Sequence, residues 1–293
     1  MKIGIMPPLS TPIASPAYLS VIGPALEERG FASVWAPEHV LLFDEYESKY
    51  PYTADGRMGA GPTSGIHDPF AVLTYLAALT KTIRLGTGIC IVPQRNPVYT
   101  AKAVASLDQV SEGRFDFGVG IGWLAEEFAA LGAPWPNRAR RTREYLKVMQ
   151  TLWSDDVSEY HSDMYDLPPT RQNPKPWQKP HPPIIFGGES EPALKRVADI
   201  GQGWFGFGLE PDTAATHIVH LTRMLEANGR KRSDIQVSCA PKFGVPHTRE
   251  LIEGFAEAGA DQVILVVGAR DSDHLIARLD QLARDVVEPA AKM

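Results

Sequence analysis

The stretch SEGRFDFGVG, Ser111–Gly120, contains the junction that decides the fold of this chain. A helical pattern ends at a glycine, and an apolar strand begins almost at once. Glycine just past a helix end adopts the left-handed backbone that terminates the helix, and a short loop then leads into the strand. The same junction recurs as EERGFASVWA (27–36), DIGQGWFGFG (199–208) and EAGADQVILVV (257–267). Helix followed by buried strand, repeated along a chain, predicts a parallel sheet with helical crossovers.

The remaining patterns extend this repeat to eight strands, each followed by a helix. We predict the strands at Lys2–Met6, Ser33–Pro37, Ile83–Val92, Arg114–Gly120, Pro183–Gly187, Trp204–Phe207, Ile235–Ala240 and Gln262–Val267. We predict the helices at Pro16–Arg29, Pro69–Leu79, Ala101–Val110, Arg138–Leu152, Pro192–Ile200, Asp212–Asn228, Arg249–Ala258 and Asp273–Val286. Eight such units predict an α/β fold, the closed (β/α)8 TIM barrel, which needs about 250 residues. We therefore expect a single domain over residues 1–293, with insertions after strand 2 (41–68) and before strand 5 (154–182).

An open doubly wound sheet is the competing architecture. The sequence GVGIG (118–122) follows a strand and precedes a helix, as a dinucleotide-binding fingerprint would. However, it reads G-x-G-x-G and continues with Trp123, and a basic helix follows where an acidic residue is expected about 20 residues on. The uniform repeat on both sides favours the barrel.

The composition indicates a soluble intracellular protein. The 293 residues are 44% hydrophobic and carry a net charge of −6, which argues against nucleic acid or an anionic membrane as the main partner. The two cysteines, Cys90 and Cys239, both lie in predicted strands, which fits reduced thiols rather than a disulfide framework. The N-terminus lacks the apolar run of a signal peptide, and the apolar helical segments are too short to span a bilayer. We expect a cytoplasmic location.

The two insertions differ in their relation to the predicted strands. Residues 41–68 follow the carboxyl end of a strand, where barrel active sites are built, so they are a candidate lid. Its tyrosines Tyr46, Tyr50 and Tyr52 can form an aromatic lid, anchor the loop or make a dimer contact. Residues 154–182 follow a helix, and we interpret them as a short hairpin over a barrel end with a proline-rich extended path.

The carboxyl ends of the predicted strands are glycine-rich, apolar and aromatic. They carry few carboxylates, no convincing set of metal ligands and no nucleophile–base pair. A barrel mouth of this kind suits a flat, largely apolar ring system. The chemistry would then belong mostly to a cofactor.

Several motifs in order resemble the bacterial luciferase-like family of flavin- and deazaflavin-dependent oxidoreductases. They are SVWAPEH (33–39), IRLGTGICIVPQRNP (83–97), GRFDFGVGIGWLAEEFAALG (113–132) with RRTREYLKVMQTLW (140–153), and KPHPPIIFGGES (179–190) with RVADIGQGW (196–204). The resemblance covers nearly the whole chain. Within the family, the chain is most similar to the actinobacterial-type subgroup that uses coenzyme F420, a 5-deazaflavin.

The resemblance implies site residues on the second and third strands. In the deazaflavin-dependent members a bulge with a non-prolyl cis peptide supports the central cofactor ring, and the matching bond here is Gly88–Ile89, with Ile91 following. An ordinary strand glycine that relieves crowding is the alternative interpretation of Gly88. The family's acid–histidine pair, often Asp-His, matches Glu38 and His39, which implies catalytic roles for both. Imidazole can donate or accept a proton near neutral pH.

Further positions follow from the same resemblance. Gly187, Gly188 and Ser190 match the turn that contacts the phosphate-bearing side chain of the cofactor, although Ser190 as a plain helix cap is the alternative. Glu189 complicates this turn, because a carboxylate repels phosphate unless it points away. Glu126 matches a cofactor-contacting amide, and Trp123 stands where some relatives have a catalytic glutamate. We expect Met6 and Trp123 in the substrate pocket, with core packing as the alternative for Trp123.

We therefore predict hydride transfer between coenzyme F420 and an unidentified small organic substrate at the barrel mouth. An FMN-dependent monooxygenase is the first alternative, since the same barrel serves both cofactors. A flavin- or deazaflavin-binding protein without turnover is the second. We expect a homodimer, because family members often pair, and we expect no metal.

Overall fold

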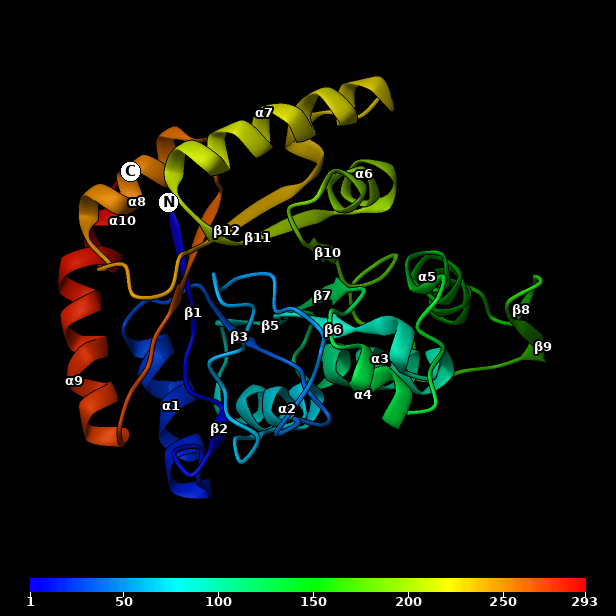
Figure 1. Ribbon diagram of the computed structural model, residues 1–293, viewed down its shortest axis with the longest axis horizontal. Helices are drawn as coiled ribbons and strands as arrows, with labels where there is room; N and C mark the ends of the chain where they lie inside the picture. The colour runs from blue at the N-terminus through cyan, green and yellow to red at the C-terminus, as the bar shows by residue number, and fades with distance from the viewer.

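A closed ring of parallel strands lies at the centre of the computed structural model, which describes residues 1–293 (Figure 1). The strands are β1 (Lys2–Met6), β3 (Ser33–Ala36), β5 (Arg84–Thr87), β6 (Cys90–Ile91), β7 (Phe115–Gly120), β10 (Ile184–Gly187), β11 (Gly203–Leu209), β12 (Gln236–Pro241) and β13 (Gln262–Val266). They pair in the order β10-β11-β12-β13-β1-β3-β5-β7, and β10 pairs with β7 to close the ring. Because β5 and β6 are two parts of one interrupted strand, the predicted (β/α)8 barrel is confirmed.

Helices surround the ring, close to their predicted positions. They are α1 (Pro16–Glu28), α2 (Pro69–Leu79), α3 (Pro97–Val110), α5 (Arg138–Ser154), α6 (Glu191–Ile200), α7 (Pro211–Ala227), α8 (Arg249–Glu257) and α9 (Ser272–Leu282). Ser15, Asp68 and Asn96 cap three of them by accepting hydrogen bonds from backbone N–H groups of the first turn. The Asn96 cap explains why α3 begins at Pro97 rather than at Ala101. A short helix that we did not predict, α4 (Ala125–Ala130), follows β7.

The helix–glycine–strand junctions have two different physical origins. At Gly30, Gly113 and Gly259 the backbone φ is +75°, +80° and +91°, as expected for a glycine that ends a helix. At Gly201, however, φ is −81°. A Cβ atom there would lie 3.0 Å from the Cα atom of Val197, so this glycine permits close packing rather than a left-handed turn.

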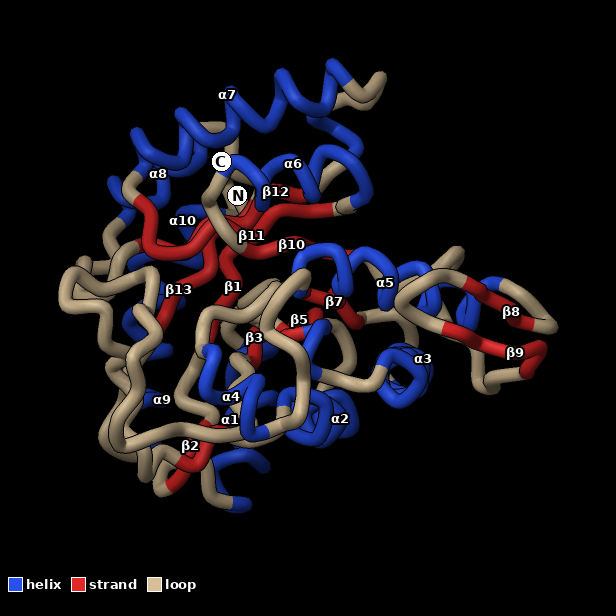
Figure 2. The backbone as a smooth tube through the Cα atoms, turned by 45° about the vertical axis from the view of Figure 1, so that its right-hand side comes forward, coloured by secondary structure: helices blue, strands red, loops and turns tan.

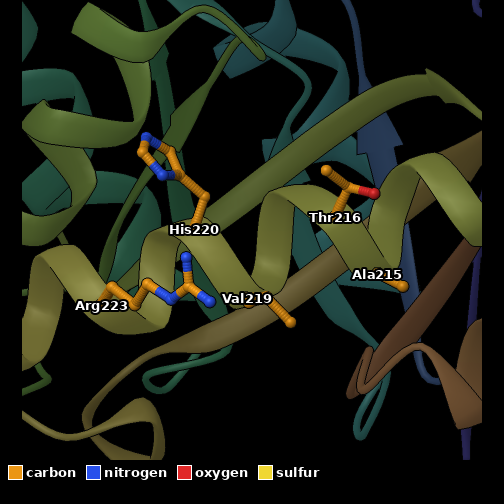
Figure 3. Close-up of a pocket in the computed structure, with 5 residues that line it drawn as sticks. All are labelled: Ala215, Thr216, Val219, His220 and Arg223. Carbon is orange, nitrogen blue, oxygen red and sulfur yellow. The ribbon is translucent and has the colours of Figure 1, made fainter.

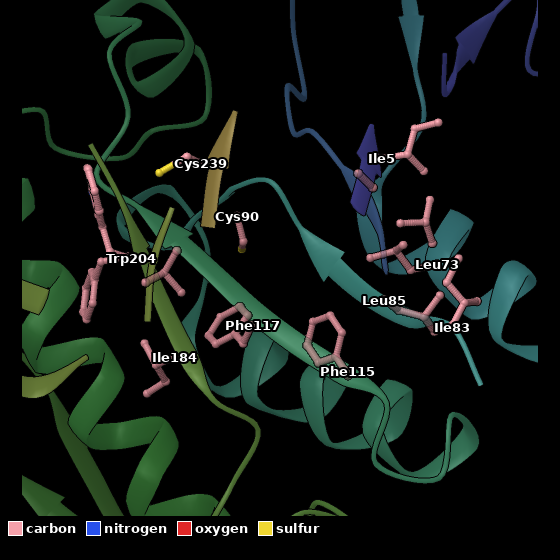
Figure 4. Packing of buried hydrophobic residues seen from close by; sticks show 14 of the residues in the cluster. Ile5, Leu73, Ile83, Leu85, Cys90, Phe115, Phe117, Ile184, Trp204 and Cys239 are labelled. Atoms are coloured by element: carbon pink, nitrogen blue, oxygen red, sulfur yellow. The ribbon is translucent and has the colours of Figure 1, made fainter. Parts of the chain in front are cut away.

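Most of the apolar core lies between the strands and the helices. Alternate residues of β7, Phe115 and Phe117, point outward, where Phe117 meets Trp153 of α5 at 6.1 Å between ring centroids. Figure 4 shows Phe115 and Phe117 among the buried side chains of this layer. A smaller cluster fills the inside of the barrel: Met6, Trp35, Ile185, Phe205, Ala240 and Ile264.

The two insertions occupy different parts of the molecule. The first ends in β4 (Gly65–Ile66), which pairs antiparallel with β2 (Ser10–Thr11), and is otherwise loop (Figure 2). The second forms the hairpin of β8 (Ser158–His161) and β9 (Asp166–Thr170), which packs on α5 and projects away from the ring (Figures 1 and 2). The hairpin itself is therefore as expected, but it does not cover a barrel end. The extended residues after it reach the barrel, where Gln178 Nε2 donates to the Phe115 carbonyl at 2.7 Å.

The two ends of the chain lie together on the side of the barrel where the strands begin. After α9 a π-helical turn, Ala283–Val287, leads into α10 (Glu288–Ala290). The N-terminal ammonium of Met1 donates to the carbonyl of Ala290 at 2.9 Å. None of the helices combines the length and the apolar character that a membrane crossing requires.

Candidate active site

The third strand position carries a bulge at the barrel mouth. The peptide bond between Gly88 and Ile89 is cis and separates β5 from β6, as the family resemblance implied. A Cβ atom on Gly88 would lie 2.8 Å from Met6 Cε and 3.2 Å from Phe205 Cε1. Gly88 therefore faces the apolar interior of the barrel, and the predicted pocket residue Met6 lies beside it.

Glycines of the neighbouring strands make room for this bulge. A Cβ atom on Gly118 would lie 1.8 Å from the Thr87 carbonyl oxygen, and one on Gly120 would lie 2.2 Å from Ile89 Cδ1. On β10, a Cβ atom on Gly187 would lie 2.6 Å from the same Ile89 atom. The glycine-rich strand ends thus let the bulge lie directly against β7 and β10, where larger side chains would exclude it.

Glu38 supports the bulge from behind. One carboxylate oxygen accepts the backbone N–H of Ile91 at 2.5 Å, and the other accepts Arg95 Nε at 2.5 Å. Arg95 also pairs with Asp68 at 2.8 Å. Glu38 is only 4% exposed, and both its oxygens are engaged by the protein. These contacts hold β6 in place. The catalytic role of Glu38 stays a prediction, and neither carboxylate oxygen is free to take part in it.

His39 pairs with a residue that the sequence analysis did not single out. Its Nδ1 lies 3.1 Å from Oε2 of Glu127, and the two side chains are 10% and 2% exposed. The other oxygen of Glu127 accepts the backbone N–H groups of Val40 and Leu41 at 2.6 and 3.1 Å. The carboxylate that pairs with His39 in the structure is therefore Glu127 of α4, 88 residues along the chain, rather than the adjacent Glu38.

The neighbouring Glu126 anchors the first insertion. Its Oε1 accepts the backbone N–H groups of Glu47 and Ser48 at 2.6 and 3.1 Å, while Ser48 Oγ accepts the N–H of Ala125. Burial raises the pKa of Glu126, but hydrogen bonds from Ser48 and the backbone outweigh it and lower the pKa to about 2. Only Oε2 of Glu126, a buried atom that has no hydrogen-bond partner, is thus left for the predicted contact with the cofactor.

Aromatic side chains of the first insertion pack across the mouth in a continuous row. Trp123 contacts the rings of His39, Tyr46 and Tyr50 with centroid distances of 5.7, 5.6 and 5.1 Å. The row continues through Tyr52 to Phe207 of β11 at centroid distances of 5.4 and 4.9 Å. Trp123 is therefore part of an aromatic wall at the mouth rather than of the buried core. Tyr46 also anchors the insertion, because its hydroxyl accepts the N–H of Met58 at 2.9 Å. We call the three tyrosines the lid tyrosines, because they lie over the mouth.

The turn after β10 has the geometry of an anion site. Gly188 adopts φ +102°, a conformation that L side chains rarely adopt, and its carbonyl accepts Trp204 Nε1 at 2.9 Å. Ser190 stands at the N-cap of α6 but makes no capping hydrogen bond with its side chain. Its hydroxyl and the N–H of Glu191 are therefore available to a ligand, whereas Pro192 has no N–H and the N–H of Ala193 donates to the Ser190 carbonyl at 2.8 Å.

Glu189 points away from this turn. Its Oε1 accepts the N–H of Phe207 at 2.7 Å, and Tyr52 hydrogen-bonds the same carboxyl group. Burial raises the pKa of Glu189 to about 7, against the lowering effect of these hydrogen bonds. Because the carboxyl faces β11 and the lid and is largely protonated below neutral pH, it interferes little with an anion at Ser190.

Arg196 of α6 lies near two arginines of α5, Arg138 and Arg143, and Arg143 also pairs with Asp199 at 2.8 Å. Arg196 of α6 is 6% exposed, its Nε is buried without a partner, and no protein acceptor binds its other nitrogens. Burial, together with the nearby Arg143 and Arg138, lowers the pKa of Arg196 to about 10. Arg138 donates from Nε to the Gly122 carbonyl, just after β7. A buried guanidinium with other cations beside it is the arrangement expected where an anion binds.

A hollow on another part of the surface offers few groups that could take part in catalysis. A shallow hollow over the outer face of α7 is lined by Ala215, Thr216, Val219, His220 and Arg223, whose side chains follow the helix (Figure 3). It contains none of the predicted site residues and no carboxylate. No group of three or more histidine, cysteine, aspartate or glutamate side chains is placed to hold a metal ion.

The structure brings most of the predicted site residues to one end of the barrel. Met6, His39, Gly88, Ile89, Ile91 and Trp123 lie around the third strand, and Gly187, Gly188 and Ser190 lie two strands further on. Glu127 and Arg196 were missed. The sequence offered two signals for them: two consecutive acids soon after the fourth strand, and an arginine in the second turn after the GGES turn. Neither signal reveals a buried partner by itself.

Comparisons with known proteins agree with this architecture. Residues 2–284 match the family model described as luciferase-like monooxygenase. An uncharacterized protein of Mycobacterium tuberculosis is 31% identical over 206 residues, 70% of each chain. The FMNH2-dependent dimethylsulfone monooxygenase of Pseudomonas putida is 30% identical over 166 residues, 56% of this chain and 46% of that protein.

Solved structures share the fold at low sequence identity. The monooxygenase RslO1 from Streptomyces bottropensis superposes with a TM-score of 0.78 and 19% identity, covering 99% of this chain and 100% of that chain. An F420-dependent secondary alcohol dehydrogenase in complex with an F420-acetone adduct gives a TM-score of 0.75 and 20% identity over 97% and 98%. The match of the family model to nearly the whole chain establishes the family relationship: this chain belongs to the luciferase-like monooxygenase family.

Proposed function

We propose that this protein is an oxidoreductase that transfers hydride between coenzyme F420 and a small organic substrate at the barrel mouth. The observation that carries the proposal is the Gly88–Ile89 bulge at a barrel mouth with an apolar interior and an aromatic wall, together with a buried arginine on α6 that lacks a partner. A planar ring with an anionic side chain matches these features better than a compact polar metabolite does.

The residues present fit the anionic part of such a cofactor. Arg196 and Arg138 supply positive charge, while Ser190 supplies a hydroxyl donor and Glu191 a backbone N–H. Charge-assisted hydrogen bonds from arginine to phosphate are about twice as strong as neutral ones. The free guanidinium nitrogens of Arg196 are the strongest indication, because an unpaired buried cation is costly unless a ligand completes it.

The residues also fit the ring. Ile89 and Ile91 present apolar side chains from the bulge, and the lid tyrosines and Trp123 can cover the ring and keep water out. A bound deazaflavin would supply the two-electron hydride chemistry, since a carbon replaces the reactive nitrogen of a flavin. Glu38 holds the bulge in place through Ile91, and His39 holds or moves the proton that accompanies the hydride.

An FMN-dependent monooxygenase is the second candidate. The relative from Pseudomonas putida, which matches about half of this chain, uses reduced FMN according to its name and favours this reading. The arginine cluster also suits the phosphate of FMN. The choice of F420 depends on the likeness of the motifs from SVWAPEH to GGES to the F420-dependent subgroup.

Titration of the purified protein distinguishes these candidates. Tryptophan fluorescence is followed while oxidised F420 or FMN is added, with Arg196→Gln as the matched variant. We expect micromolar binding of F420, at least about tenfold tighter than FMN, and a loss of about tenfold or more in Arg196→Gln. Binding of FMN alone overturns the choice of cofactor. Binding of either cofactor without turnover on carbonyls, alcohols and enones would instead support a non-catalytic binding protein.

We also propose that the chain forms a homodimer through the outer face of α1, α2 and α3. These adjacent helices expose apolar side chains: Val21, Tyr75, Leu79, Tyr99 and Val110. Tyr99 alone is 81% exposed, which is unusual for a large aromatic residue without a partner. Light scattering after gel filtration should show a dimer that Tyr99→Asp with Tyr75→Asp converts to a monomer. A monomeric wild type would refute the dimer.

A further inference from the structure

His39 is fixed on one side only. Its Nδ1 meets Oε2 of Glu127 at 3.1 Å, whereas no protein atom hydrogen-bonds Nε2. The edge of the ring also meets Trp123 at a centroid distance of 5.7 Å, so the imidazole plane is held as well. Nε2 is therefore the nitrogen left for a bound molecule.

Glu127 is arranged as an acceptor. Two backbone N–H groups, those of Val40 and Leu41, donate to Oε1, and Nδ1 of His39 lies within hydrogen-bond distance of Oε2. The side chain is 2% exposed, so water cannot replace these donors. An ionised carboxylate only accepts hydrogen bonds. In neutral His39, Nδ1 must then carry the proton and Nε2 the lone pair.

We propose that Glu127 is the positioning residue of His39: it selects the Nδ1–H tautomer and thereby presents Nε2 as a hydrogen-bond acceptor to the reacting molecule. The effect of this tautomer on turnover rests on the proposed function, whereas the hydrogen-bond geometry of His39 does not. Glu38, the acid next to His39 in the sequence, is fully engaged with Ile91 and Arg95 instead.

The tautomer indicates a substrate class. A lone pair on Nε2 suits a hydroxyl group, so we expect an alcohol in the oxidative direction and a carbonyl compound in the reverse. A bound deazaflavin would take the hydrogen of the C–H bond together with its electron pair, while the O–H proton passes to Nε2 and the carbonyl forms. The imidazolium that results is stabilised by the adjacent Glu127 carboxylate. In carbonyl reduction the same proton and hydride return.

Glu127→Gln tests the proposal on the whole protein without any cofactor. The amide keeps an oxygen for Val40 and Leu41 but turns an N–H toward Nδ1, which forces the proton onto Nε2. Long-range ¹H–¹⁵N spectra of ¹⁵N-histidine-labelled protein report the tautomer, with the His39 signals identified by their loss in His39→Asn. Glu126→Gln is the matched control, since it makes the same change one residue away, on a side chain that contacts no histidine.

We expect Nδ1–H in wild type and in Glu126→Gln, and Nε2–H in Glu127→Gln. With cofactor and an alcohol, Glu127→Gln should lower kcat about 100-fold with little change in KM and alter the pH profile, as expected for the loss of a correctly oriented base. A wild type with the proton on Nε2 overturns the proposal even if Glu127→Gln does not fold. So does a folded Glu127→Gln protein with unchanged tautomer. Failure of the proposed function would appear differently, as absent turnover in a wild type with the expected tautomer.

Discussion

The two insertions of this barrel share some residue types but differ in what they contact. Each contains tyrosines, and each carries or adjoins a histidine that pairs with carboxylates: His39 with Glu127, and His161 with Glu159 and Asp166. The first insertion follows β3 and lies over the mouth, whereas the second follows α5 and packs on its outer side. His39 is 10% exposed, while His161 is 55% exposed.

The difference shows that the point of insertion decides the role. A segment that leaves the carboxyl end of a barrel strand must cross the mouth, where the reacting groups gather. A segment that leaves the end of a helix returns along the opposite face of the barrel and meets only scaffold. Tyr160 accordingly donates to Glu144 of α5 at 2.5 Å.

The largest expected effect separates the two histidines. His39→Ala should lower turnover by about 10²–10⁴-fold, because a positioned proton-transfer group contributes that much. Its melting temperature should stay close to that of wild type. His161→Ala should leave turnover unchanged, since a surface ion pair contributes little. Steady-state kinetics with thermal melts of both variants give the answer, and equal turnover in the two would remove His39 from the mechanism.

The next largest effect distinguishes the tyrosines of the first insertion from those of the second. Tyr50→Ala with Tyr52→Ala removes the middle of the aromatic row and should weaken cofactor binding by about 10–100-fold, because each aromatic contact contributes roughly 0.5–1.5 kcal/mol beyond its buried area. Tyr160→Ala with Tyr165→Ala removes two tyrosines from the second insertion and should change only stability. Fluorescence titration measures both. A loss of affinity in the second pair would contradict the division of roles.

A smaller effect concerns the pH dependence of stability. The pKa of Glu189 rises from 4.5 to about 7 on folding, so the folded state binds the extra proton between these values. Stability from this group is present below pH 4.5 and is lost as pH rises toward 7, by on the order of 2–3 kcal/mol. Glu189→Gln should flatten this decline in urea unfolding from pH 5 to 8. Glu159→Gln of the second insertion is the control, because the side chain of Glu159 is exposed. Gln262→Glu would not serve, because Gln262 is buried.

The smallest effect should follow removal of the hairpin. Ser158 and Thr170 are paired, so residues 159–169 can be replaced by two glycines without separating β8 from β9 at their base. We expect turnover and cofactor affinity within about twofold of wild type, and a melting temperature lower by a few degrees, about 1–2 kcal/mol of stability. Loss of binding would show that the second insertion reaches the site.

The sequence predicted the scaffold better than the site. Glycine junctions and apolar strands located all eight strands, because helix termination and strand burial are local properties. The break at Gly88 within the predicted strand Ile83–Val92, and the cis bond there, followed from family resemblance alone. The partner of His39 could not be predicted, because a pairing across 88 residues depends on how α4 packs beneath the lid. The direction of the Glu189 side chain likewise could not be predicted, because it depends on a hydrogen bond from Phe207, a residue of another strand.

A crystal structure with oxidised coenzyme F420 tests the central claim most directly. The account predicts the deazaflavin ring against residues 87–91, the lid tyrosines and Trp123 on its exposed side, and phosphate at Ser190 and Arg196. Density for the ring at another surface, such as the hollow on α7, would contradict it. So would a saturated complex in which the mouth stays filled by its own aromatic side chains.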